Sequence, residues 1–79
     1  MNLRLTSVLI LLGGLLLTGT AHAQDASLEK AKESFMTAQG QYARGEYKEA
    51  RESFQAAYDA RPFAQFLFNI GACHEKLFE

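Results

Sequence analysis

Residues 45–54 read Gly45-Glu46-Tyr47-Lys48-Glu49-Ala50-Arg51-Glu52-Ser53-Phe54, and they carry the strongest indication of the architecture. They join a glycine turn to the start of an amphipathic segment. Apolar residues recur there at spacings of +3, +4 and +3, on one face of a helix: Tyr47, Ala50, Phe54 and Ala57. Pro62 disfavours helical geometry at the residue before it, so the sequence predicts a helix that ends by Ala60.

The segment before this stretch predicts another helix. Ser27 is a good N-cap candidate, and Glu29 lies in the first turn, where the helix dipole favours an acidic group. Apolar residues then recur at +3, +4, +3 and +4: Leu28, Ala31, Phe35, Ala38 and Tyr42. Gly45 suits a left-handed C-cap, and the short turn predicts an antiparallel helical hairpin.

A third segment, residues 63–78, is the most apolar part of the chain after residue 23. Its apolar residues are Phe63, Phe66, Leu67, Phe68, Ile70, Cys73, Leu77 and Phe78. One helical stripe is predicted along Leu67, Ile70, His74 and Leu77. Gly71 in mid-helix costs about 1 kcal/mol relative to alanine, a cost best accepted where another backbone approaches closely. No alternating run predicts a strand, so the predicted class is all-α.

Residues 1–23 predict a secretory signal peptide. Arg4 supplies the positive start, residues 8–17 form an apolar run broken by two glycines, and Ala21-His22-Ala23 is a small-residue cleavage motif. The rival interpretation, a membrane anchor, needs about 20 apolar residues, and this run is shorter. We expect cleavage after Ala23, a mature chain that begins at Gln24, and export to the periplasm or beyond in a bacterium. Membrane contact is then expected only through the transient signal peptide.

Composition excludes several classes of protein. The 79 residues carry a formal charge of -1, with 48% hydrophobic and 22% charged residues, which excludes collagen-like, low-complexity and strongly disordered chains. Residues 24–79 hold seven basic and nine acidic side chains, a charge of -2. A nucleic-acid clamp would need clustered basic residues, so we expect no nucleic-acid partner.

The sequence shows no catalytic or metal-binding constellation. Cys73 and His74 are adjacent, but a zinc site needs about four ligands, so packing roles are expected for both. Pairing of Cys73 with a second chain is the open alternative. The serines lie outside any nucleophile-elbow motif, and Glu46, Glu49 and Glu52 are spaced as a helix surface. We therefore expect neither enzyme activity nor a cofactor.

The turn and second helix resemble the tetratricopeptide repeat, a helix-turn-helix unit of 34 residues. Residues 45–50 resemble that family's turn into its second helix. Ala50-x3-Phe54 matches the A-x3-F element, Ala57 is the next small packing position, and Pro62 matches the closing proline. The resemblance implies that small residues let the helices approach while large ones fill the space between them.

The following helix resembles the opening of a further repeat. Leu67-x2-Ile70-Gly71-x2-His74 corresponds to W-x2-L-G-x2-Y, with the glycine retained. The first helix has Ser34-x2-Thr37-Ala38-x2-Gln41, in which only Ala38 fits, as in an atypical terminal repeat. Residues implied to pack the repeats are Tyr47, Ala50, Phe54, Ala57, Pro62, Leu67, Ile70 and Gly71.

The predicted organisation is therefore a TPR-like solenoid of about one and a half repeats. Residues 24–30 form a lead-in with the helix cap, 31–62 the first hairpin, and 63–79 the first helix of an incomplete second repeat. Such units usually need at least about three repeats for stability. We expect a fragment of a longer repeat protein, or alternatively a small self-associating helical envelope protein without its own binding groove.

The resemblance implies a scaffold for protein–protein contact. Family members hold extended peptides or partner helices along a concave face made by the first helix of each repeat. On this chain the face comprises Lys32, Phe35, Gln39, Tyr42, Phe68, Ala72 and Glu75. The spacings place each set on one side of its helix. The alternative is that Phe35 and Tyr42 pack internally, and the partner is a protein or peptide.

Overall fold

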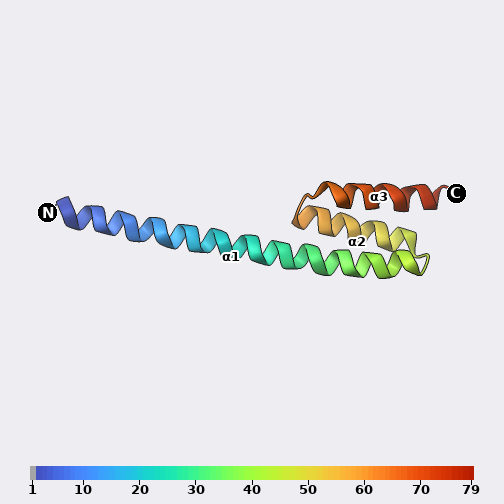
Figure 1. Ribbon diagram of the computed structural model, residues 1–79, viewed down its shortest axis with the longest axis horizontal. Coiled ribbons are helices and arrows are strands. Elements are labelled where there is room, and N and C mark those ends of the chain that lie inside the picture. Colours follow the sequence, from blue (N-terminus) through green and yellow to red (C-terminus); the bar gives the residue numbers. More distant parts are fainter. Residues whose placement is uncertain (1) are drawn as a thin grey trace.

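The computed structural model describes residues 2–79, with side chains from His22 onward. Three helices follow one another: α1 (Asn2–Ala43), α2 (Tyr47–Ala60) and α3 (Ala64–Leu77). Residues 2–79 contain no strand, so the predicted all-α class is confirmed for this part of the chain. In Figure 1, α2 packs along the C-terminal part of α1 and α3 packs along α2, and the N-terminal part of α1 projects beyond them.

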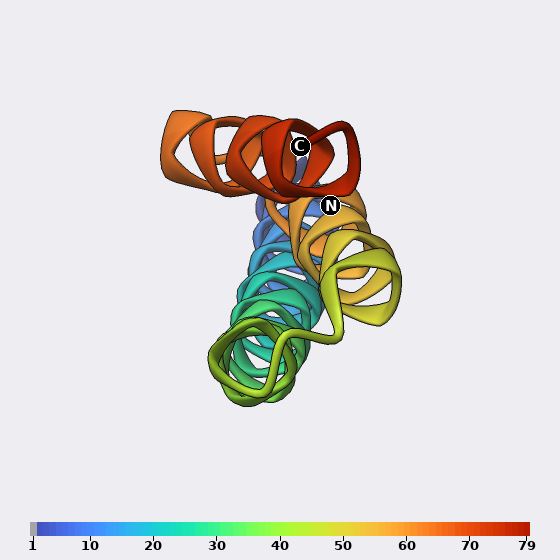
Figure 2. The ribbon, with the colours of Figure 1, turned by 90° about the vertical axis from the view of Figure 1, so that its right-hand side faces the viewer.

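The helices pack in chain order, each against the next. α2 runs back along α1, and α3 runs back along α2, so that both connections are sharp reversals. Figure 2 shows α2 placed between the other two helices, with α3 inclined to α1 rather than parallel to it. Because of this inclination, α1 and α3 lie on either side of α2, and a space remains between α1 and α3.

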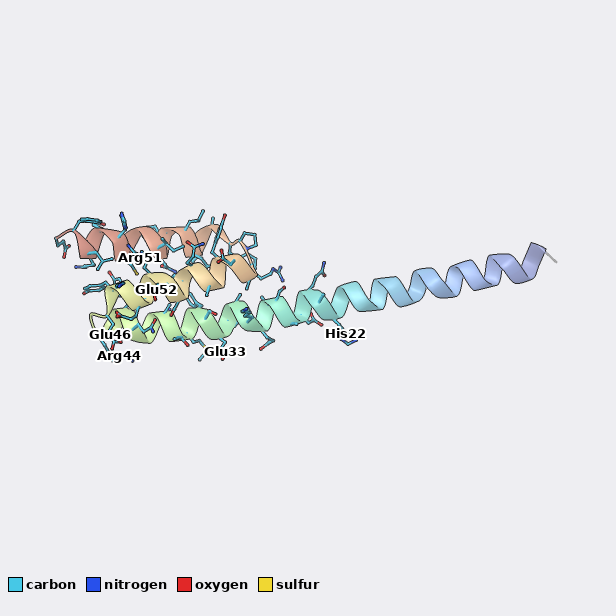
Figure 3. The ribbon with its side chains drawn as sticks, turned by 180° about the vertical axis from the view of Figure 1, so that it is seen from behind. His22, Glu33, Arg44, Glu46, Arg51 and Glu52 are labelled. Carbon is cyan, nitrogen blue, oxygen red and sulfur yellow. The ribbon has the colours of Figure 1, made fainter. Side chains whose placement is uncertain are left out.

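The turn between α1 and α2 forms because Gly45 adopts the left-handed region, with φ of +79°. The amide of Glu46 donates to the carbonyl of Gln41 at 2.9 Å, and the amide of Gly45 donates to the carbonyl of Tyr42 at 3.0 Å. These two bonds are the pair that defines a Schellman motif, which satisfies the last carbonyls of a helix. An exposed Arg44–Glu46 ion pair of 2.9 Å, labelled in Figure 3, spans the same turn.

The reversal between α2 and α3 follows from Pro62. Arg61 has extended backbone angles (φ -145°, ψ 113°), as expected for the residue before a proline. Its amide still donates to the carbonyl of Ala57 at 2.9 Å and closes the last turn of α2. α2 ends at Ala60, so the predicted end of this helix is confirmed.

The start of α1 differs from the prediction. α1 begins at Asn2 and continues through Ser27, so the expected helix start and cap at Ser27 are wrong for this chain. No proline interrupts residues 2–43, so each of these residues after the first turn can donate its backbone N–H to a continuing helix. The hydroxyl of Ser27 instead donates back along the helix to the carbonyl of Gln24 at 2.9 Å.

The signal-peptide prediction falls mostly on side chains that the structure does not describe. Arg4, the apolar run of residues 8–17 and Ala21 lie outside the described side chains. Within the part of the chain whose side chains are described, no helix is long and apolar enough to span a bilayer.

The core consists of two small clusters between the helices. One joins Ala38, Ala50, Phe54 and Cys73, and the other joins Ala31, Ala57 and Phe66. Four of these seven residues are alanines, each exposed by 1% or less. Small side chains let helix backbones approach closely, so the gap between α1 and α2 is filled by few large groups.

The buried face of α3 differs from the predicted stripe. Phe66 and Cys73 are the buried residues of α3, whereas Leu67 is 50% exposed and Leu77 is 40% exposed. Of the predicted stripe, only Ile70 packs against a core cluster. Since α3 is apolar on most sides, spacing alone does not select its inner face. The inner face is the one that carries Phe66, because the ring of Phe66 packs 5.5 Å from that of Phe35 on α1.

Candidate functional site

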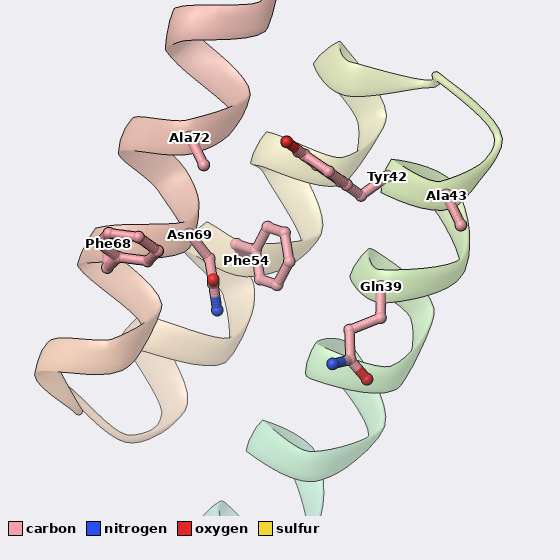
Figure 4. Close-up of a pocket in the computed structure, with 7 residues that line it drawn as sticks. All are labelled: Gln39, Tyr42, Ala43, Phe54, Phe68, Asn69 and Ala72. Carbon is pink, nitrogen blue, oxygen red and sulfur yellow. The ribbon is translucent and has the colours of Figure 1, made fainter.

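A groove opens between α1 and α3, with α2 beneath it. Its volume is about 360 Å³, and its lining residues come from all three helices: Gln39, Tyr42, Ala43, Phe54, Phe68, Asn69 and Ala72. Figure 4 shows these side chains around the space between the helices. The groove exists because α1 and α3 both pack against α2 but are inclined away from each other.

Three aromatic side chains, one from each helix, line the groove. Phe54 on α2 is 4% exposed and lies at the base, where its ring also packs 5.8 Å from that of Phe35. Phe68 on α3 is 77% exposed and stands at the rim. Tyr42 on α1 is held edge-on against Tyr47 at 5.1 Å between ring centres. A fixed aromatic base and an exposed aromatic rim suit an apolar side chain entering from solvent.

Two amide side chains flank this apolar surface. Gln39 comes from α1 and Asn69 from α3, and Figure 4 shows them on opposite sides of the space between these helices. Each amide offers a carbonyl acceptor and an NH₂ donor, the complement of a peptide backbone. No charged side chain is among the residues that line the groove, so the surface is neutral.

Four of the seven residues predicted to form a binding face line the groove: Gln39, Tyr42, Phe68 and Ala72. The other three lie elsewhere. Phe35 is half-buried, and its ring packs against Phe54 and Phe66 inside the protein. Lys32 is exposed and pairs with Glu29 at 3.6 Å, and Glu75 is exposed outside the groove. The alternative that Phe35 packs internally therefore describes its position.

The residues implied to pack the repeats fall into two groups. Ala50, Phe54 and Ala57 are buried, and Tyr47 and Ile70 are half-buried. Pro62, Leu67 and Gly71 are exposed. A methyl group added at Gly71 would meet no heavy atom beyond its own helical turn within 4 Å, so no described backbone approaches it.

Sequence reasoning missed Ala43 and Asn69 as lining residues, and it gave Phe54 only a packing role. Asn69 lies three residues before Ala72, which was already assigned to the face, so the helical spacing carried that signal. That Phe54 also lines the groove depends on the tilt of α3, for which the sequence contains no comparable signal.

Cys73 and His74 lie in different environments. Cys73 is fully buried among Ala38, Ala50 and Phe54. This burial raises the pKa of its thiol, partly opposed by the nearby positive charge of Arg51. His74 is exposed, and its ring lies edge-on to Phe78 at 4.8 Å. Within the described side chains, no group of three or more metal-binding residues comes together.

The predicted cleavage segment lies on the projecting part of α1. His22, Ala23, Gln24 and Asp25 are all exposed, and Figure 3 shows His22 well away from α2 and α3. The one tertiary contact described at this segment is that of Arg61 with the Gln24 carbonyl, so a peptidase meets little packing there, although the helix itself must unwind. No protein-family model, curated protein or solved structure matches this chain.

Proposed function

We propose that this chain is an exported, tetratricopeptide-like interaction module that binds a partner peptide or helix in the groove between α1 and α3. The observation that carries the proposal is the groove itself, lined from three helices by aromatic rings and two amides. Export with cleavage after Ala23 is part of the proposal. It is supported by the signal-peptide pattern and by the exposure of residues 22–25.

The dimensions of the groove favour one kind of occupant. A volume of about 360 Å³ is at the small end of ligand sites and holds one large apolar side chain with part of its backbone. The amides of Gln39 and Asn69 are then available to the peptide groups on either side. The neutral lining favours an uncharged segment over an acidic or basic one.

A displayed library of random linear peptides tests the proposal. The purified protein should enrich peptides that share a large apolar residue, and Phe68→Ala should weaken their binding by about tenfold or more. Leu67→Ala is the matched control, since Leu67 is an exposed residue on the same helix that does not line the groove. Both residues are exposed, so both variants should fold normally. Peptides that bind both variants equally well would refute the assignment of the groove.

A second candidate function rests on the outer side of α3. Exposed apolar side chains gather there and at its ends: Phe63, Leu67, Leu77 and Phe78, with the open position at Gly71 between them. A further helix would cover such a face, supplied either by a longer repeat array or by a second copy in a self-associating envelope protein. Helicity measured over a wide dilution series separates these cases. Loss of helicity on dilution would favour the second copy.

A further inference from the structure

Gln24 becomes the N-terminal residue if cleavage follows Ala23, and the structure describes its surroundings. Gln24 is exposed on the projecting part of α1. Its carbonyl accepts the hydroxyl of Ser27 at 2.9 Å, and Nη1 of Arg61 lies 3.5 Å from the same oxygen. The carbonyl of Gln24 is thus held in the first turn of the shortened helix, while its amine and side chain remain accessible.

Positive charge lies close to this terminus. The first turn of a helix carries the positive end of the dipole, which disfavours a positive group there. Arg61 adds a full positive charge beside the Gln24 carbonyl, at the corner between α2 and α3. Asp25 and Glu29 are exposed acids on α1 that act in the opposite sense. An uncharged α-amine is a nucleophile, and the nearest electrophile is the side-chain amide of the same residue.

We propose that Gln24 cyclises to pyroglutamate once the signal peptide is removed, an inference that rests on the proposed cleavage site. The α-amine attacks the side-chain carbonyl carbon of Gln24, and a new carbon–nitrogen bond closes a five-membered lactam. The bond from that carbon to the side-chain nitrogen breaks, and one proton from the amine leaves with the departing group as ammonia. No oxidant, reductant or further reactant is consumed.

The modification relieves an electrostatic conflict in the mature protein. The lactam nitrogen is uncharged, so a positive group is removed from the positive end of α1. Its blocked nitrogen also makes the chain end resistant to aminopeptidases, at a segment that no other helix covers.

The test is mass spectrometry of the full precursor, residues 1–79, expressed with its own signal peptide and recovered from the export compartment. The expected N-terminal peptide begins at Gln24 and is lighter than the unmodified peptide by one ammonia. A peptide that begins at Gln24 with its full mass would overturn this inference alone. A different first residue, or an uncleaved precursor, would overturn both it and the proposed cleavage site.

Two controls make the result specific. Gln24→Ala cannot cyclise, so its N-terminal peptide should keep its full mass and a free amine. An isotope-labelled peptide with the sequence of residues 24–32, added at harvest, reports any cyclisation during handling. A cyclised fraction in the protein no greater than that in the added peptide would also overturn the proposal.

Discussion

Gly45 and Gly71 provide a pair of identical substitutions whose effects on stability should have opposite signs. Gly45 has φ of +79°, and a methyl group there meets nothing within 4 Å. The effect of Gly45→Ala is therefore backbone strain without a clash. A left-handed residue with a Cβ costs about 1–2 kcal/mol. Alanine also restricts the unfolded chain, which returns about 0.4–1 kcal/mol. The net expectation is a loss of about 1 kcal/mol.

Gly71→Ala should have the reverse effect. Gly71 lies inside α3, with ordinary helical geometry and open space around its missing side chain. Alanine is favoured over glycine in a helix interior by about 1 kcal/mol. Since no described atom is displaced, the whole of this difference should appear as added stability.

Urea unfolding followed by far-UV circular dichroism measures both variants against the parent protein. With a slope of about 1 kcal/mol/M for a chain this small, the two midpoints should move by about 1 M in opposite directions. An unchanged midpoint for Gly45→Ala would refute the left-handed turn. Destabilisation by Gly71→Ala would show that another backbone covers Gly71 in solution, contrary to its open surroundings here.

Three other predictions follow from the packing. Ser53→Ala removes the hydrogen bond of 2.6 Å from the Ser53 hydroxyl to Oε1 of Gln41 and should cost about 1 kcal/mol. The double variant Ser53→Ala/Gln41→Ala should lose less unfolding free energy than the sum of the losses in the two single variants. Losses that add strictly in urea denaturation would contradict this hydrogen bond between α1 and α2. Ala50→Leu should cost about 1–3 kcal/mol, because Ala50 has no exposed surface, and an unchanged melting temperature would mean a wider gap between the helices. Cys73 should react with thiol reagents only as fast as the protein opens, and immediate labelling would contradict its burial. Because the folded thiol has a raised pKa, its contribution to stability is complete below the unfolded pKa of about 8.5 and is lost as pH rises further.

The hairpin of α1 and α2 was predictable because its signals agree. In both helices apolar residues keep a single helical face, and the residues on it include the buried Ala38, Ala50 and Phe54. Gly45 and Pro62 mark the two reversals for steric reasons that act within a few residues. Local chemistry alone therefore determines where these helices end and which sides they turn inward.

The start of α1, the inner face of α3 and the base of the groove could not be predicted, because they depend on interactions that residue spacing does not encode. The start of α1 was missed because Ser27 resembles a cap, yet the residues before it continue the helix equally well. The inner face of α3 was missed because apolar residues surround that helix, and contact between Phe66 and Phe35 settles the choice. Likewise, helical spacing was enough to assign four of the groove's lining residues to the predicted binding face. The position of Phe54 at the base of the groove depends on the tilt of α3, which spacing does not predict.

Phe35 has a consequence for how the protein opens. Among the described side chains, it is the one partly buried residue that packs against both core clusters, because its ring contacts those of Phe54 and Phe66. Neither cluster can separate without exposing part of this ring, so the two do not behave as independent foldons. Amide hydrogens near Ala50 and near Ala57 then exchange with solvent through a single cooperative event. The packed parts of the three helices, from about Ala31 onward, are therefore expected to unfold as one unit.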